Sequence, residues 1–192
     1  MEKQTGKKRP ATHTRILHVS KIIFEKNGVT KTTCADIAEE AGIARSTFFT
    51  HFASLDELYA ELNQRELIDL IDKVKELSSQ ESSPEYILKE LFAKLVDDTI
   101  KYPKTFVELL VKGLLFMPNK NKYFTEFERV VSKVAAGLLR QTPPTPEEAF
   151  TSLLGLYFGF IFKALLRDSN VTADDGRAVK AAIDRYIDSL KL

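Results

Sequence analysis

The side chains best placed for chemistry stand at the start of a short helical segment near residue 45. Arg45, Ser46 and Thr47 carry a guanidinium group and two hydroxyl groups at adjacent positions. The preceding stretch, Gly42 to Ala44, suits a tight turn, because glycine adopts positive φ at no steric cost. A second helix that offers its first side chains in this way is typical of a helix-turn-helix that enters the major groove of DNA. A plain pair of antiparallel helices has the same pattern, and the residues alone leave that alternative open.

Other reactive side chains do not stand at the spacing of a known site. His13 and His18 are five residues apart and do not share a helix face, so we expect no metal site. Cys34 begins a predicted helix whose dipole would lower the pKa of its thiol, and redox sensing is the alternative to a packed side chain. The sequence contains no phosphate loop, nucleophile elbow or catalytic triad. We therefore expect neither an enzyme nor a cofactor.

Short helices with clear ends must position the residues near Arg45. Apolar residues from Ile16 to Phe24 recur at helical spacing, and Asn27-Gly28 predicts the end of that first helix. Thr33 and Asp36 have the spacing of a capping box and predict the start of a second helix. A third helix is expected from Ser46 to Phe52.

A dense set of residues between 14 and 58 matches a known family pattern. On these residues the segment resembles the N-terminal domain of TetR-type transcriptional repressors. The matching residues are Thr14-Arg15-Ile16-Leu17, Phe24, Gly28, Thr32-Thr33, Asp36-Ile37-Ala38, Ala41-Gly42-Ile43, Thr47-Phe48-Phe49-Thr50-His51-Phe52 and Asp56-Glu57-Leu58. The resemblance implies that double-stranded DNA is bound through Thr33, Ala44, Arg45, Ser46, Thr47, Phe49, Thr50 and His51.

The resemblance also implies a role for each of these residues. Thr33 would cap a helix whose N-terminal N–H groups lie against a DNA phosphate. Arg45 is the member of its turn that can make a bidentate contact to guanine. Thr50 and His51 take positions that commonly touch base edges or phosphates.

Three residues depart from the family pattern. Ala44 replaces the usual serine cap, Phe49 replaces a tyrosine that donates to phosphate, and Leu55 replaces a lysine. These changes remove one cap and two phosphate donors, so they favour weaker operator binding. Phe48 and Phe52 are expected to anchor the recognition helix in the core.

The charge of the chain is uneven along its length. The 192 residues have a net charge of +1, yet residues 1–33 contain eight lysines and arginines against two glutamates. The basic run from Lys3 to Arg9 is either a solvated tail or an arm that seeks the DNA backbone. The single cysteine favours an intracellular protein, and the polar start of the chain does not have the pattern of a signal peptide, so we expect a cytoplasmic location.

The whole sequence has helical periodicity and predicts an all-α fold of about nine helices. Residues 1–54 are expected to form the N-terminal arm and helix-turn-helix domain, and residues 55–192 a helical ligand-binding and dimerisation domain. A long helix is predicted from Leu55 to Leu77. Pro84, Pro103, Pro146 and Thr172 indicate the starts of later helices.

Residues 85–140 are rich in aromatic side chains. Ordinary helical core is one interpretation, and an apolar cavity on converging helices is the other. The family resemblance places an effector there, expected to be a small apolar or aromatic molecule. The predicted ligand-binding residues are Phe92, Phe106, Leu110, Phe116, Tyr123, Phe127, Phe158 and Phe162.

The segment 149–166 is apolar on all faces and contains Gly155 and Gly159. It is short for a transmembrane helix and includes Lys163, so we expect no membrane span. A helix that is apolar all round is instead buried on two sides, which predicts a four-helix interface in a homodimer. The predicted interface residues are Gly155, Gly159, Phe160, Ile183, Tyr186 and Ile187.

Together these features predict a homodimeric repressor that a small effector releases from a palindromic operator. Two alternatives remain at this point. One is a helical small-molecule-binding protein with weakened DNA binding, and the other is a DNA-binding regulator with no inducer.

Overall fold

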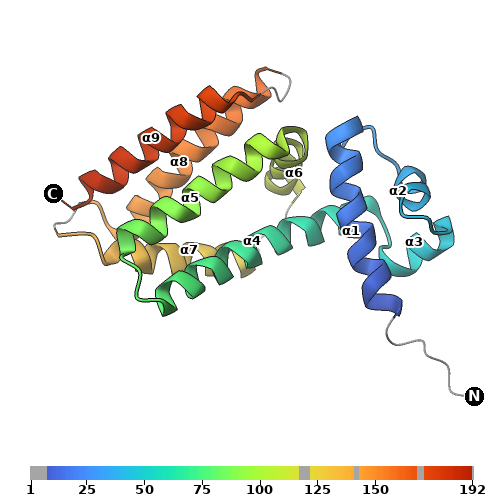
Figure 1. Cartoon of the computed structure of the whole chain (residues 1–192), viewed down its shortest axis with the longest axis horizontal. Coiled ribbons are helices and arrows are strands. Elements are labelled where there is room, and N and C mark those ends of the chain that lie inside the picture. The colour runs from blue at the N-terminus through green and yellow to red at the C-terminus, as the bar shows by residue number, and fades with distance from the viewer. Residues whose placement is uncertain (1–7, 117–121, 141–142, 168–170, 192) are drawn as a thin grey trace, which may run out of the picture.

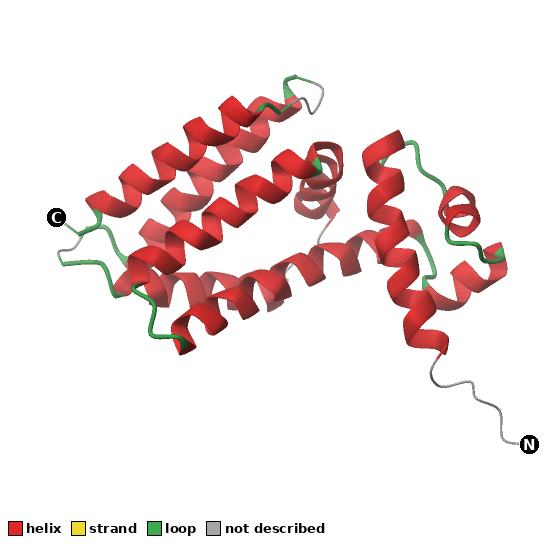
Figure 2. Cartoon of the chain, in the orientation of Figure 1, coloured by secondary structure: helices red, strands yellow, loops and turns green. Residues whose placement is uncertain are grey.

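The computed structural model describes residues 8–116, 122–140, 143–167 and 171–191, and the side chains of residues 8–10 and 110–116 lie outside that description. Within these ranges the chain forms nine α-helices and no strand, which confirms the predicted fold class (Figure 2). Figure 1 shows a small group of helices at one end and a larger bundle at the other. The helices are α1 (Lys8–Asn27), α2 (Cys34–Glu40), α3 (Arg45–His51), α4 (Leu55–Ser79), α5 (Pro84–Lys101), α6 (Pro103–Phe116), α7 (Lys122–Ala136), α8 (Pro146–Leu165) and α9 (Ala173–Ser189).

Local sequence signals set several helix ends. Gly28 follows α1 with φ of +85°, and its N–H donates to the carbonyl oxygen of Phe24 at 2.8 Å. The capping box predicted at Thr33 starts α2, and boxes of the same kind start α8 and α9. The predicted basic arm, Lys3 to Arg9, lies outside the described side chains.

The long helix α4 belongs to two hydrophobic cores. In its first half, Leu58 and Leu62 are buried together with side chains of α1, α2 and α3, a set that we call the first core. In its second half, Leu70 and Val74 are buried with side chains of α5 to α9, which form the second core. The first core therefore continues into α4 as far as Leu62, beyond the division predicted at residue 54.

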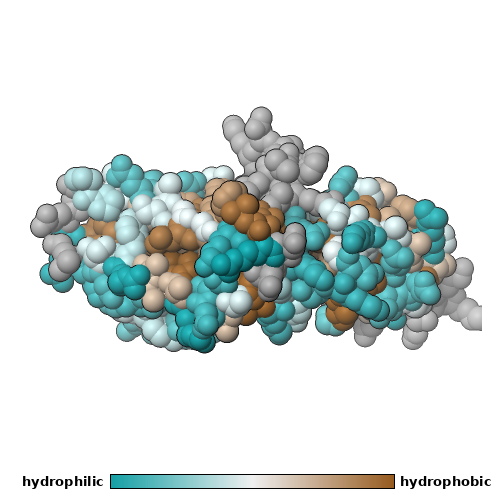
Figure 3. Space-filling view, turned by 90° about the horizontal axis from the view of Figure 1, so that it is seen from above, coloured by the Kyte–Doolittle hydropathy of each residue, from teal (hydrophilic) through white to brown (hydrophobic). Residues whose placement is uncertain are grey.

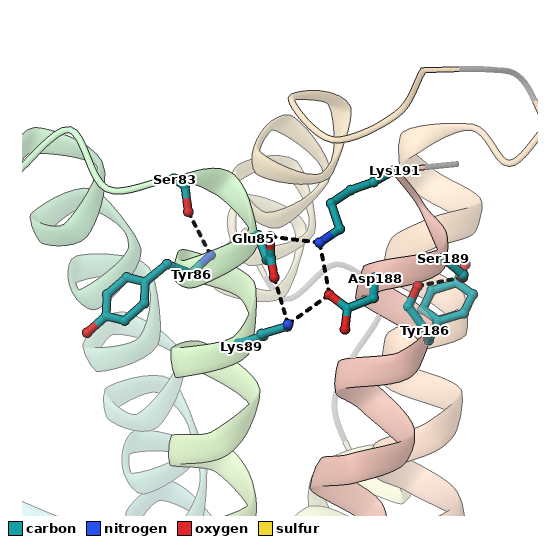
Figure 4. A network of polar contacts seen from close by, with 8 residues as sticks. All are labelled: Ser83, Glu85, Tyr86, Lys89, Tyr186, Asp188, Ser189 and Lys191. Carbon is teal, nitrogen blue, oxygen red and sulfur yellow. Dashed lines mark hydrogen bonds and ion pairs between the residues drawn. The ribbon is translucent and has the colours of Figure 1, made fainter.

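The larger bundle is closed by α9, which packs along α5 and α8 (Figure 1). Near the start of α5 and the end of α9, Lys89 donates hydrogen bonds to Glu85 at 2.7 Å and to Asp188 at 2.8 Å (Figure 4). Lys191 donates to Glu85 at 2.9 Å and completes the network. Hydrogen bonds from Lys89 and then Lys191 hold the pKa of Asp188 at about 2.

Among the described residues, α8 is the one helix that is long and apolar enough to cross a membrane by length and composition. Its side chains Phe150, Leu153 and Ile161 are buried in the second core, and a buried core helix can have the same length and apolar composition. The surface seen from above the bundle carries hydrophobic patches between hydrophilic residues (Figure 3).

Candidate nucleic-acid interface

The helix pair α2 and α3 is held at a fixed angle by a tight turn. Gly42 has φ of +61°, and the N–H of Ile43 donates to the carbonyl oxygen of Ala38 at 2.9 Å. Ile37 on α2 and Phe48 on α3 are both fully buried in the first core. This packing gives α3 one inward side and leaves its other side open to solvent.

The open side of α3 carries the residues predicted to read DNA. Arg45, Ser46 and Thr50 are exposed, and Thr47 is half-buried. The guanidinium carbon of Arg45 lies 5.8 Å from the centre of the Phe49 ring, a cation–π contact that orients the side chain along the surface. The structure thus places Arg45, Ser46 and Thr50 on the solvent-facing side of α3, with Arg45 and Ser46 at its N-terminus.

Thr33 caps α2 as predicted. Its hydroxyl accepts from the N–H of Asp36 at 3.3 Å, and its own N–H donates to the Asp36 carboxylate at 2.8 Å. The hydrogen bond from the Thr33 backbone and then that from its hydroxyl lower the pKa of Asp36. A capped and exposed helix start next to α3 is a suitable place for a phosphate.

His51 lies in a small aromatic cluster rather than fully on the open side. Its ring is 5.6 Å from that of His13 on α1, and His13 stacks on Phe52 at 4.6 Å. The Nε2 atom of His13 is 2.8 Å from Glu61 Oε1 on α4. His13 therefore connects α1 to α3 and α4 through its ring contacts and its hydrogen bond. No local sequence pattern predicted this role. Among the described residues, no group of three His, Cys, Asp or Glu side chains could hold a metal.

The three departures from the family pattern have separate structural outcomes. Ala44 is the N-cap of α3 and makes no side-chain cap hydrogen bond. Phe49 is 44% exposed and lacks the hydroxyl group of the tyrosine that the family pattern has at this position. Leu55 is half-buried and packs against the first core. The structure thus favours a packing role for Leu55 over a place on the DNA backbone.

Cys34 is half-buried at the start of α2. Burial raises the pKa of its thiol, and the charge of Arg45 lowers it to a smaller degree. A raised thiol pKa disfavours the thiolate, so the structure favours a packed side chain over a redox sensor.

A family profile described as bacterial regulatory proteins, tetR family, matches residues 16–62. This N-terminal segment is therefore similar to the TetR family. The match ends at Leu62, which is also the last residue that α4 contributes to the first core. The family profile and the packing therefore delimit the same segment, residues 16–62, which we call the DNA-reading unit.

A TetR-family relative in Pseudomonas putida, the HTH-type transcriptional regulator TtgR, is 29% identical over 107 residues. The match covers 55% of this chain and 50% of that protein. The chain thus spans about half the length of the relatives it matches in sequence.

Solved structures of similar fold include the larger bundle as well as the N-terminal helices. The repressor FadR of Thermus thermophilus, in complex with lauroyl-CoA, superposes with a TM-score of 0.65 at 21% identity, over 94% of this chain and 95% of that one. FadR of Bacillus subtilis, in complex with stearoyl-CoA, gives 0.71 at 13% identity, over 92% and 98%. At these identities the likeness establishes the fold alone.

In the larger bundle the predicted ligand residues occupy different environments. Phe92 and Phe127 are buried in the second core, whereas Phe162 is 62% exposed. Phe162 therefore points away from any interior cavity, and its predicted place in a ligand site needs correction. The others are half-buried, namely Phe106, Tyr123 and Phe158, or have side chains outside the description, namely Leu110 and Phe116.

The predicted dimer residues also differ in their exposure to solvent and fall into three groups. Phe160, Ile183 and Ile187 are buried inside the subunit, because α9 turns its apolar stripe toward α5 and α8. Those three residues are therefore wrong as interface residues. Gly155 and Gly159 are exposed, and nothing lies within 4 Å of where their Cβ atoms would be. Tyr186 is half-buried.

Sequence reasoning missed the contacts that join the DNA-reading unit to α6. The Glu108 carboxylate accepts from the N–H groups of Val29 at 2.8 Å and Thr30 at 3.2 Å. Thr105 donates its N–H to Glu25 on α1 at 3.2 Å, and Leu109 is buried in the first core. No sequence signal could have found these partners, because the pairs are separated by about 80 positions.

Proposed function

We propose that this chain is a DNA-binding transcriptional regulator that inserts α3 into the major groove of an operator. The observation that carries the proposal is the division of α3 into a buried side held by Phe48 and an open side that bears Arg45. A short helix anchored in this way can present its N-terminal side chains to base edges without losing its orientation. Arg45 supplies direct readout of guanine, and Thr33 and Thr50 contact the backbone.

The test compares DNA binding of two arginine variants by fluorescence anisotropy, with duplexes from the region upstream of the gene. Arg45→Ala is expected to cost ~1–3 kcal/mol and to flatten the preference at one base position in each half-site. Arg185→Ala, which removes another exposed arginine, on α9, is the matched control and should leave binding unchanged. A uniform loss on all sequences with a shallower salt slope would make Arg45 a phosphate contact instead.

The proposed regulator acts as a homodimer that joins through the open side of α8. Gly155, Gly159, Phe162 and Leu166 follow one another at intervals of four, three and four residues, so they form one stripe along the helix. All four are exposed, and the two glycines allow close approach of a second α8. A two-fold dimer would set the two recognition helices roughly 34–36 Å apart on a palindromic operator. Sedimentation that finds only monomer at micromolar concentration would remove this part of the proposal.

The effector is proposed to be a small molecule with an apolar or aromatic body, bound among the helices of residues 85–166. The support is the aromatic lining of the bundle, in which Phe127 meets Phe150 edge-on at 5.8 Å. Two proteins of similar fold were crystallised with acyl-CoA, a ligand that has a long apolar part. Binding of the effector would release the operator, which makes the protein a repressor.

The coupling between the two parts is proposed to pass through α6. Its residues Thr105, Glu108 and Leu109 contact α1, the loop after α1 and the first core, while Val107 of α6 packs in the second core. A ligand that shifts α6 would therefore move the attachment of the DNA-reading unit. Coupling of this kind is typically ~1–3 kcal/mol.

A second candidate is a helical small-molecule-binding protein with weakened DNA binding. The missing cap at Ala44 and the inward packing of Leu55 favour it. Both candidates imply a protein that works in the cytoplasm and performs no catalysis. The anisotropy titration separates them, because the second predicts the same weak affinity for every duplex.

A further inference from the structure

A surface groove lies where the end of α4, the start of α5 and the helix α7 meet. Its volume is about 450 Å³, within the range of roughly 300–1,000 Å³ usual for small-molecule sites. It stands at the end of α4 remote from the DNA-reading helices (Figure 1). None of its lining residues is among those predicted to bind DNA or the effector, so the groove is distinct from both sites.

The floor of the groove is apolar. Val74 of α4 and Ile87 of α5 are buried, and Val130 and Val134 of α7 are half-buried. One end is closed by close helix packing, because a Cβ at Gly137 would come within 2.9 Å of Pro84. An apolar body can thus be held against a preformed surface.

The rim of the groove is basic. Lys75 of α4 and Lys133 of α7 are exposed on different walls, and Arg129 of α7 lines the same groove. Arg129 is engaged with Glu126 through two hydrogen bonds of 2.8 Å, and Lys75 lies 3.9 Å from Asp72. Among the described residues no carboxylate lies within ion-pair distance of Lys133.

The charges on the two walls act on one another across the groove. The hydrogen bonds from Arg129 lower the pKa of Glu126 most, and the charge of Lys75 on the facing helix lowers it further. Of the three cations that line the groove, Lys75 and Arg129 each have a carboxylate partner, and Lys133 has none among the described residues. A neutral apolar ligand would leave that charge without a partner.

From this combination we propose that the groove binds an amphipathic organic anion, a molecule with an apolar ring or chain and one carboxylate or sulfonate group. The apolar part lies on Val74, Ile87, Val130 and Val134. The anionic group lies between Lys75 and Lys133, each of which can donate a charge-assisted hydrogen bond. This site is separate from the proposed effector site and does not depend on DNA binding.

The experiment compares two fluorescent probes that share an aromatic body and differ in charge. They are 1-anilinonaphthalene-8-sulfonate, an anion, and N-phenyl-1-naphthylamine, which is neutral. The double variant Lys75→Met with Lys133→Met should raise the Kd of the anionic probe about tenfold or more, since a tenfold change needs only ~1.4 kcal/mol. The Kd of the neutral probe should change by less than about twofold.

Matched variants and a positional readout complete the test. Lys31→Met removes an exposed lysine in the loop after α1, outside the groove lining, and should leave both Kd values unchanged. Lys133→Arg should retain binding of the anionic probe. Methyl resonances of Val130 and Val134 should shift when that probe is added to the wild-type protein. An unchanged Kd in the double variant, an equal loss for both probes, or probe-induced shifts confined to other methyl groups would each overturn the proposal.

Discussion

Removal of the Glu108 carboxylate should loosen the attachment of the DNA-reading unit. In the structure this carboxylate accepts hydrogen bonds from the N–H groups of Val29 and Thr30. Val29 is fully buried, so its N–H would be left without an acceptor in Glu108→Ala, at a cost of ~1–3 kcal/mol. Thr30 is exposed, and water can replace its lost partner. We therefore expect a local cost of about 2 kcal/mol.

Native-state hydrogen exchange measures this cost at the Val29 amide itself. A local opening made easier by about 2 kcal/mol corresponds to roughly 30-fold faster exchange. The exchange of Phe92, deep in the second core, should stay as in the wild type. Glu90→Ala is the control, because Glu90 is exposed on α5 and lies beside α9, in the part of the bundle lined by Lys180 and Asp184. Equal exchange rates at Val29 in the two variants would refute the idea that Glu108 holds this loop.

Three further outcomes are expected. Asp188→Asn should lower the thermal midpoint at neutral pH, because the ionised Asp188 stabilises the folded state. The difference from the wild type should fade as the pH falls from about 4 to about 2, where Asp188 takes up a proton in the unfolded and then in the folded state. A difference that persists below pH 2 would contradict the role of the Asp188 charge. Leu55→Lys should lower the thermal midpoint by ~2–4 °C, because about 1 kcal/mol of half-buried packing is lost. The slope of log K for DNA binding against log salt concentration should not change. A slope steeper by about 0.9 with an unchanged midpoint would instead place residue 55 on the DNA backbone. Phe162→Glu should shift sedimentation toward monomer without lowering the helix content, whereas a dimer that survives the change would exclude the open side of α8 as its interface.

Local signals were enough to predict most of the fold. The capping box at Thr33, the glycine after α1 and the prolines at helix starts act within a few residues, so the sequence carries them directly. The same holds for the solvent-facing residues of α3, because its short length and the buried Phe48 leave few possible orientations.

The apolar stripe of α9 shows where local reasoning ends. Periodicity placed Ile183 and Ile187 on one side of a helix correctly, but it could not say whether that side meets the same subunit or a partner. The answer depends on α5, about 90 residues earlier, whose own apolar side needs the cover that α9 provides. The groove beside Lys133 was missed for a similar reason, since its walls come from α4 and α7.

The continuity of α4 through both cores has a consequence for how such proteins exchange parts during evolution. A recombination event that joined residues 1–54 to a different bundle would leave out Leu58 and Leu62, and it would also lose Leu109 of α6 from the first core. Each missing leucine is expected to cost ~2–5 kcal/mol, against a total stability of roughly 5–15 kcal/mol. New operator specificities should therefore arise by substitutions on the open side of α3 far more readily than by transplanting the helix-turn-helix alone. Successful chimaeras should carry the first half of α4 with the DNA-reading helices and a matching apolar residue at position 109.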